Sequence, residues 1–286
     1  MIRIDAHQHF WRIARGDYGW LTAAGHPAIH RDFLPNDLSP LLKNARIEKT
    51  ILVQAAPSVA ETEFLLELAA DTSFVAGVVG WVDFEAPDAA KAIDHLARNK
   101  SLLGLRPMIQ DLADDDWVLS RRIEPAITAM KANNLRFDAL VKPRHLPSLR
   151  RFIDRHAGLP VVIDHGAKPD IAQDDIDRWE GAIRTIARET RAYCKLSGLA
   201  TEARKNFDAQ DIRPAVDILC DAFGAERLMW GSDWPVVNEA WDTGKSFSPE
   251  PYTRWHAIAG DLTRSLSGSA NDRLFGGTAA EFYGVA

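Results

Sequence analysis

Eight short runs of apolar, largely β-branched residues recur along this chain, and a longer helix-like stretch follows each of them. The runs occupy residues 2–9, 50–55, 75–83, 102–108, 135–141, 160–166, 192–198 and 227–234. Most are apolar on both faces, which is typical of strands buried between helices in a parallel sheet. This alternation predicts either an open, doubly wound sheet or a closed (β/α)8 barrel.

The end of the first run favours the barrel. An open sheet usually carries a glycine-rich turn after its first strand, whereas residues 7–11 read HQHFW and contain no glycine. The length of 286 residues also suits a barrel, which typically needs about 250. We therefore predict an α/β fold in which one domain, residues 1–286, forms a (β/α)8 TIM barrel, with an extra C-terminal helix at 270–283.

Composition excludes several classes of protein. The 34 Lys and Arg against 40 Asp and Glu give a net charge of −6, so no basic stripe is available for nucleic acid. Two cysteines, Cys194 and Cys220, are too few for a disulfide framework or an all-cysteine zinc site. No apolar stretch is long enough to span a membrane. We expect a cytoplasmic protein that binds neither nucleic acid nor membrane, and a homo-oligomer is left open.

Two segments between the predicted elements are longer than ordinary loops. They are residues 10–36, after the first strand, and residues 235–254, after the last. Because the first and last strands are neighbours in a closed barrel, we expect the two segments to lie side by side over one mouth of the barrel. Long loops in compact domains are usually functional.

Histidines mark the end of the first strand. Residues two apart in a strand point the same way, so Asp5, His7 and His9 share a face. The carboxyl end of a barrel strand is where active sites of this fold are built. Two imidazoles there can bind one metal ion or polarise one carbonyl group, although a structural role is an open alternative.

Three more polar residues lie at the ends of later strands. We expect Asp164 to cap a helix, and His165 has the parity of Val161 and Ile163, so its ring points inward if those side chains fill the barrel. Asp233 ends the eighth strand and lies beside the first strand in a closed barrel. The alternative for Asp233 is a buried ion pair with a lysine, which would place a costly charge at the mouth.

The combination of His-x-His, a further histidine and an aspartate resembles the amidohydrolase superfamily, and within it the group of sugar lactone hydrolases. The stretches that carry the resemblance are DAHQHFW at 5–11, LGLR at 103–106, VIDHGAKP at 162–169, CKLSG at 194–198, WGSDWP at 230–235 and TAAEFY at 278–283. It spans essentially the whole chain.

The resemblance implies an active site as well as a fold. His7, His9, His165 and Asp233 match the family's metal ligands and catalytic base. Members with two metals bridge them with a lysine or glutamate from strand four or five, and this chain has no good candidate there. We therefore expect one divalent ion, zinc, or none. Because some lactonases of this kind work without a metal, its requirement is left open.

The implied reaction is hydrolysis of the ester bond of a sugar lactone to the aldonic acid. Such a reaction needs a base for the water and an electrophile for the carbonyl oxygen. We expect Asp233 to be the base, and the three histidines to hold an ion or to donate hydrogen bonds to the oxyanion. Lys195 and Ser197 share a face at the end of strand seven. Lys195 either pairs with Asp233, protonates the leaving hydroxyl, or forms a structural ion pair.

Substrate contacts are expected from residues at the other strand ends. Arg106 suits a lactone carbonyl or a carboxylate, and tryptophans suit the C–H faces of a sugar. The candidates are Arg106, Trp11, Trp81, Trp234 and Ser197, with Trp20 as a further aromatic and Gln54, Asp83 and Asp138 for hydroxyl groups.

A single mouth-facing arginine favours a neutral sugar lactone over a pyrone dicarboxylate. The resemblance implies L-fuconolactone or a related galactono- or rhamnonolactone. Two other functions stay open at this point. One is a metal-dependent decarboxylase of the same superfamily, and the other is a sugar-binding barrel without catalysis.

Overall fold

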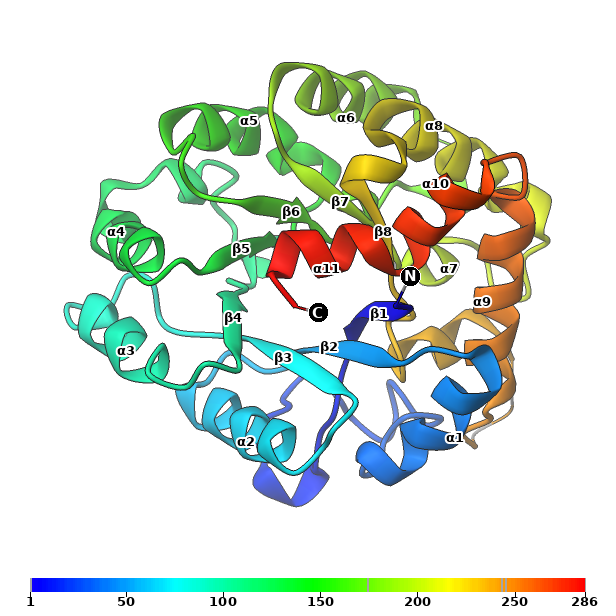
Figure 1. Cartoon of the computed structure of the whole chain (residues 1–286), viewed down its shortest axis with the longest axis horizontal. Helices are drawn as coiled ribbons and strands as arrows, with labels where there is room; N and C mark the ends of the chain where they lie inside the picture. Colours follow the sequence, from blue (N-terminus) through cyan, green and yellow to red (C-terminus); the bar gives the residue numbers. More distant parts are fainter. Residues whose placement is uncertain (1, 174, 243, 245, 286) are drawn as a thin grey trace.

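The computed structural model describes residues 2–173, 175–242, 244 and 246–285. Its eight strands are all parallel and follow one another in a single sheet in chain order, with helices around them (Figure 1). The strands are β1 (Ile4–Gln8), β2 (Lys49–Val53), β3 (Val75–Gly80), β4 (Leu102–Leu105), β5 (Arg136–Ala139), β6 (Val161–Ile163), β7 (Tyr193–Leu196) and β8 (Leu228–Trp230). Each lies inside one of the runs expected from the sequence or overlaps it within a residue.

Helices alternate with the strands. They are α1 (Pro35–Ala45), α2 (Val59–Ala70), α3 (Ala89–Leu96), α4 (Glu124–Ala132), α5 (Leu146–Arg155), α6 (Asp177–Glu189), α7 (Leu199–Glu202), α8 (Ala209–Arg227), α9 (Glu250–Leu262), α10 (Gly268–Asp272) and α11 (Thr278–Tyr283). In the part of the chain that the structure describes, none of these helices combines the length and apolar character that a membrane crossing requires.

The β1 and β8 ends meet, which closes the sheet into a barrel. His9 N donates to Trp234 O at 2.8 Å, and Asp233 N donates to His7 O at 2.8 Å. A side chain at Gly231 is excluded, because a Cβ there would lie 2.7 Å from the Cβ of His7. The prediction of a closed (β/α)8 barrel is confirmed, and the open-sheet alternative is wrong.

The C-terminal helix covers the end of the barrel that lies opposite the carboxyl ends of the strands. In Figure 1, α11 crosses the centre of the ring of strands. Its apolar side chains complete the core inside the barrel, which consists of Ile4, Ala6, Ile51, Val53, Val79, Val162, Met229, Ala279, Phe282 and Tyr283. The extra helix is therefore confirmed, although a π-helical turn, Arg273–Gly277, divides the expected span into α10 and α11.

The two long segments meet over the mouth, as expected. The ring of Phe33, from the first segment, lies 5.2 Å from Trp234 and 5.0 Å from Phe247 of the second, measured between centroids. Residues 243 and 245, which belong to the second segment, lie outside the described residues. Aromatic packing therefore joins the segments at the closure of the barrel.

A buried carboxyl group supports the loop after β2. Glu61 Oε1 accepts from Ala55 N at 2.9 Å, and its Oε2 accepts from Ala56 N at 2.9 Å. The helix that carries it starts at an N-cap, since Ser58 Oγ accepts from Glu61 N at 3.0 Å. Burial raises the pKa of Glu61 from its ordinary 4.5 to about 7.

Stability is expected to depend on pH through Glu61. Because its folded-state pKa is raised, its contribution to the free energy of unfolding is fully present below pH 4.5 and lost as the pH rises through 7. Between those limits the wild type should lose about 3 kcal/mol relative to Glu61→Gln. Denaturant unfolding of both proteins across this range measures the difference. Glu63→Gln, at an exposed position of the same helix, is the control. A difference between wild type and Glu61→Gln that stays constant with pH would contradict the expectation.

Candidate functional site

The four residues that the sequence singled out converge at the carboxyl ends of β1, β6 and β8. His7 Nε2 lies 3.2 Å from His9 Nε2. Asp233 Oδ1 lies 3.2 Å from His9 Nε2, 3.7 Å from His7 Nε2 and 3.9 Å from His165 Nε2. Three imidazoles therefore surround one carboxylate oxygen, and all four side chains are buried.

The alternation of side chains along β6 does not explain why the ring of His165 reaches this cluster. Val161 and Ile163 belong to the core between strands and helices, while Val162 belongs to the core inside the barrel. The parity expectation is therefore wrong. His165 instead leaves the strand with a φ of 55°, which turns its ring toward the cluster. Gly198 leaves room for the ring, since a Cβ there would lie 2.4 Å from His165 Nδ1.

Ser197 holds His165 from the side away from the cluster. Its Oγ lies 2.9 Å from His165 Nδ1, and the residue is fully buried. This contact leaves His165 Nε2 facing Asp233. The structure thus gives Ser197, expected to touch the substrate, a role in orienting a histidine.

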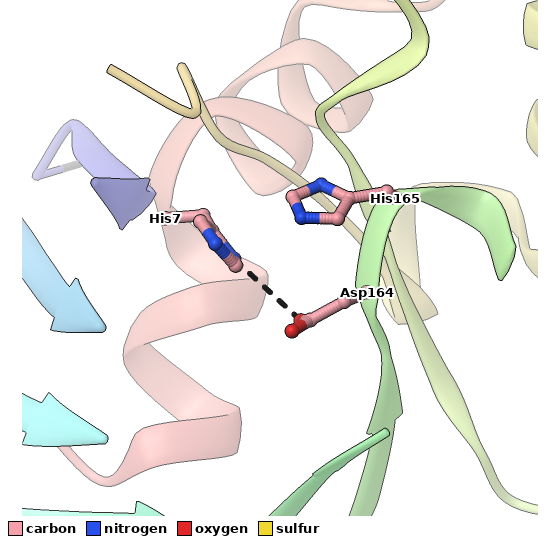
Figure 2. A group of neighbouring side chains, drawn as sticks. All are labelled: His7, Asp164 and His165. Carbon is pink, nitrogen blue, oxygen red and sulfur yellow. Dashed lines mark ion pairs between the residues drawn. The ribbon is translucent and has the colours of Figure 1, made fainter. Parts of the chain in front are cut away.

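Asp164 belongs to the site, and the expectation that it caps a helix is wrong. Its Oδ1 lies 3.0 Å from Lys195 Nζ and 3.6 Å from His7 Nδ1, and its Oδ2 lies 3.4 Å from Arg106 Nη1. Figure 2 shows its carboxylate pointing at the His7 ring. Burial acts to raise the pKa of Asp164, but the Lys195 ammonium and His7 outweigh it and hold that pKa well below its usual range.

Lys195 lies beneath His7 and does not pair with Asp233 in the structure. Its Nζ is 2.6 Å from Asp138 Oδ2 and 3.2 Å from His7 Nδ1. The expected Lys195–Asp233 pair is therefore wrong, and the structural ion pair is the alternative that the structure supports. Asp138 is fully buried and its Oδ2 accepts from Lys195, so the structure supports an ion-pair role for it.

Sequence reasoning missed Tyr283 altogether. Its hydroxyl donates to Asp138 Oδ2 at 2.7 Å, across 145 positions of sequence. The resemblance had marked the stretch 278–283, but no pattern in it indicates that a tyrosine reaches the barrel interior. The Asp138 position at the end of a strand was the other available signal.

Two imidazoles of the cluster, those of His7 and His165, are neutral near pH 7 because their pKa values are lowered. Burial, and next the Lys195 ammonium, lower the pKa of His7 well below its usual range. Burial lowers the pKa of His165 to about 4. For Asp233, burial acts to raise the pKa, but His165, His9 and His7 together outweigh it, so the pKa lies below its ordinary value. The site therefore combines the neutral imidazoles of His7 and His165 with the ionised carboxylate of Asp233.

These donors fit a single metal ion. Neutral imidazole and carboxylate are ligands that zinc prefers, with bonds of about 2.0–2.2 Å in a tetrahedron. Those bonds place neighbouring ligand atoms about 3.4 Å apart, and the atoms around Asp233 Oδ1 lie 3.2–3.9 Å from it. His7, His9 and Asp233 form one group of ligands close enough for an ion, and His7, Asp164 and His165 form another.

Gln54 and Arg106 lie beside the cluster and hold each other. Gln54 Nε2 donates to Arg106 O at 2.8 Å, and the Arg106 guanidinium donates to Gln54 O. Arg106 Nη1 is 3.4 Å from His7 Nε2. Within the described residues, Arg106 Nε and Gln54 Oε1 are buried without a hydrogen-bond partner, so both have capacity for a ligand.

The four tryptophans expected near the substrate divide into two groups, of which one packs in the interior and the other lines a cavity. Trp11 and Trp234 are fully buried, and Trp234 packs against Phe10 and Phe33. Their burial gives them a packing role in this structure. Trp81, together with Trp20, instead lines a cavity of about 540 Å³.

The cavity lies next to the residues that flank the cluster, and the link runs through Met108 and Gln54. Met108 lines it, and Met108 Sδ lies 3.2 Å from Gln54 Nε2. Among the described residues, no lysine or arginine lines the cavity. The charged side chains in its lining are all acidic, and they are those of Asp17, Asp83, Glu85 and Asp111. Aromatic faces with carboxylate acceptors suit a neutral, hydroxylated ligand better than an anion.

Comparison with known proteins agrees with this site. The chain matches the amidohydrolase family over residues 4–285. An L-fucono-1,5-lactonase of Burkholderia ambifaria is 48% identical, over 99% of this chain and 96% of that protein. An L-fucono-1,5-lactonase of Burkholderia multivorans is 39% identical, again over 99% and 96%. The crystal structure of an amidohydrolase from Burkholderia multivorans with bound zinc matches with a TM-score of 0.90 and 38% identity, covering 100% of both chains. The chain therefore belongs to the amidohydrolase family.

Proposed function

We propose that this protein hydrolyses the ester bond of a sugar lactone, and that its substrate is L-fucono-1,5-lactone or a closely related neutral aldonolactone. Similarity to two L-fucono-1,5-lactonases over nearly the whole chain supports the reaction class. The observation that carries the mechanism is the position of Asp233 Oδ1 within 3.9 Å of three imidazole nitrogens.

The first step is attack of water on the lactone carbonyl. The ionised carboxylate of Asp233 takes one proton of the water, and the oxygen forms a bond to the carbonyl carbon. Negative charge moves to the carbonyl oxygen, where imidazole N–H groups of the cluster stabilise it. The bond from the carbonyl carbon to the ring oxygen then breaks, and the proton held by Asp233 moves to that oxygen. The product is the open-chain aldonic acid.

A divalent ion, when bound, would be held by His7, His9, His165 and Asp233, and zinc fits this donor set. It would polarise the carbonyl group and increase the acidity of the attacking water. The chain's own groups perform the same two tasks in the steps above, because neutral imidazoles donate hydrogen bonds and Asp233 accepts the proton.

The surroundings of the cluster favour a neutral substrate over a pyrone dicarboxylate. The adjoining cavity carries acidic side chains. Arg31, an arginine of the long segment after β1, pairs with Asp37 at 3.0 Å and stacks on Phe33, and it does not line the cavity. The number of domains, the location and the assembly of the protein rest on the sequence alone. A single domain across residues 1–286 and a cytoplasmic location stay predictions, and a homo-oligomer stays open.

A lactone screen tests the proposed function. A pH-indicator assay with L-fucono-, L-galactono- and L-rhamnonolactones, in five- and six-membered rings, measures release of the acid. We expect L-fucono-1,5-lactone to show the highest kcat/KM and 2-pyrone-4,6-dicarboxylate to be hydrolysed poorly. If no lactone is hydrolysed above its uncatalysed rate, the proposal is wrong and a sugar-binding barrel becomes the better reading.

Asp233→Asn should remove the base and keep the fold. The amide cannot accept the proton from water, so kcat is expected to fall at least about a hundredfold, or ~3 kcal/mol. Steady-state kinetics measure this loss, and circular dichroism checks the fold. Asp71→Asn, at an exposed position after α2, is the matched control and should behave as the wild type. Near-normal turnover of Asp233→Asn would exclude Asp233 as the base.

Metal removal separates a lactonase from an obligatory metal-dependent decarboxylase. We expect protein treated with dipicolinate, with its metal content measured by mass spectrometry, to retain at least about a tenth of its kcat, because imidazole donors remain for the oxyanion. Loss of all lactonase activity that zinc alone restores would make the ion essential.

A further inference from the structure

The loop between β2 and α2, residues 54–58, supports the wall of the cavity beside the cluster. Pro57 of this loop lines the cavity. Trp20 also lines it, and its Nε1 donates to Ala55 O at 2.8 Å. The side chain of Trp20 is 36% exposed, more than that of any other tryptophan in the chain. Its position in the wall therefore depends on few contacts, and the hydrogen bond to the β2–α2 loop is one of them.

The segment that carries Trp20 is attached to the start of α2 at a second point. Arg15 Nη2 donates to Ala60 O at 3.0 Å, and the guanidinium lies 4.5 Å from the centroid of the Phe64 ring. Arg15 Nε also donates to Oδ2 of Asp17, another residue that lines the cavity, at 2.7 Å. This part of the cavity wall thus rests on the β2–α2 loop and on the helix that follows it.

Glu61 determines the conformation of that loop. Its two carboxylate oxygens accept from Ala55 N and Ala56 N, each at 2.9 Å. Glu61 is fully buried, and Ala55 and Ala56 are at most 4% exposed, so water does not replace these acceptors. An ionised carboxylate offers two acceptor oxygens and no donor, which matches two converging N–H groups.

The loop also bears on another part of the cavity. Gln54, its first residue, donates from Nε2 to Arg106 O at 2.8 Å and lies 3.2 Å from Met108 Sδ. Pro107 and Met108 line the cavity. A displacement of the loop would therefore reach the wall both through Trp20 and through the residues after β4.

We infer that Glu61 is a positioning residue for the substrate cavity: by holding Ala55 and Ala56 it sets the ring of Trp20, against which the C–H face of the lactone packs. The inference rests on the proposed lactone hydrolysis for the identity of the ligand. The position of Trp20 does not depend on which ligand is bound. Because the hydrogen bonds of Glu61 go to the loop and not to the cluster, its effect is on substrate binding.

Glu61→Gln separates this role from a merely structural one. The amide keeps the size of the side chain, but its NH2 group faces an N–H group of the loop that has lost its acceptor. At pH 8, above the pKa of Glu61, which burial raises to about 7, the wild-type side chain is ionised. We expect KM to rise about tenfold and kcat to stay within about twofold. Steady-state kinetics with the best lactone of the screen measure both constants.

Two outcomes of that experiment would overturn the inference. One is an unchanged KM. The other is a lower apparent kcat at constant KM, because a purely structural residue reduces the amount of folded enzyme and leaves the remaining sites intact. Glu63→Gln, at an exposed position of the same helix, is the matched control and should leave both constants as in the wild type.

A double-mutant cycle tests whether the effect passes through Trp20. Trp20→Ala removes the ring and is expected to raise KM by itself. In that background Glu61→Gln should change KM by less than about twofold, because the group that it positions is gone. A full additional tenfold effect would show that Glu61 does not act through Trp20.

Fluorescence tests the position of Trp20 without any substrate. The emission of Trp20 is obtained as the difference between each protein and the same protein with Trp20→Phe. We expect acrylamide to quench Trp20 at least about 1.5-fold more strongly in Glu61→Gln, because a loosened loop exposes the ring. Equal quenching in Glu61→Gln and in the wild type contradicts the inference.

Trp20→Phe keeps the test decisive if Glu61→Gln does not fold. Phenylalanine retains an aromatic ring and lacks the N–H group that donates to Ala55 O. KM is expected to rise about threefold, because the remaining ring is no longer tied to the loop. An unchanged KM in this variant would refute the link between the loop and the wall.

Failure of the inference and failure of the proposed function give different results. If the proposed function is wrong, no lactone is hydrolysed, while the quenching of Trp20 still increases in Glu61→Gln. If the inference is wrong, the wild type hydrolyses a lactone, but Glu61→Gln leaves KM or the quenching of Trp20 unchanged.

Discussion

The pairing of β1 with the end of β8 is the contact on which the rest of the structure depends. Two backbone hydrogen bonds, from His9 N to Trp234 O and from Asp233 N to His7 O, join the first and last strands. The same bonds set His7, His9 and Asp233 next to one another. Because closure of the barrel and assembly of the site use the same backbone atoms, a chain that fails to close also fails to form the cluster of His7, His9 and Asp233.

Closure also creates a buried space that contains charges, and each needs a partner. Lys195 and Arg106 supply positive charge, and Asp138 and Asp164 supply negative charge, with Lys195 Nζ within 3.0 Å of both carboxylates. Burying such a network costs desolvation free energy, so the network is weak evidence for a large free energy of unfolding. Its consequence lies in the site, since these paired charges lie directly under His7, with Lys195 Nζ 3.2 Å from His7 Nδ1.

The sequence predicts the fold well because the barrel depends on patterns that repeat. Alternating apolar runs, the His-x-His end of the first strand and the two long segments each have a local signature. The misses have a different physical origin. His165 breaks strand parity through a left-handed backbone conformation, and Asp164 keeps the inward parity that Val162 has. The partners of Lys195 depend on which side chains share the barrel interior, and Tyr283 arrives there from a helix that follows every strand.

The proposed catalytic groups and the proposed substrate cavity belong to different parts of the molecule. The histidines and Asp233 stand on strand ends, held by backbone pairing and by the ion network below them. The adjoining cavity is lined from connecting segments, with Trp20 after β1 and Trp81 after β3. Substitutions in those segments can change the lactone that is accepted while Asp233 and the imidazoles around it, the proposed catalytic groups, stay in place. Changes beneath the cluster, such as at Tyr283, instead act on the ion network, which contacts the cluster at His7.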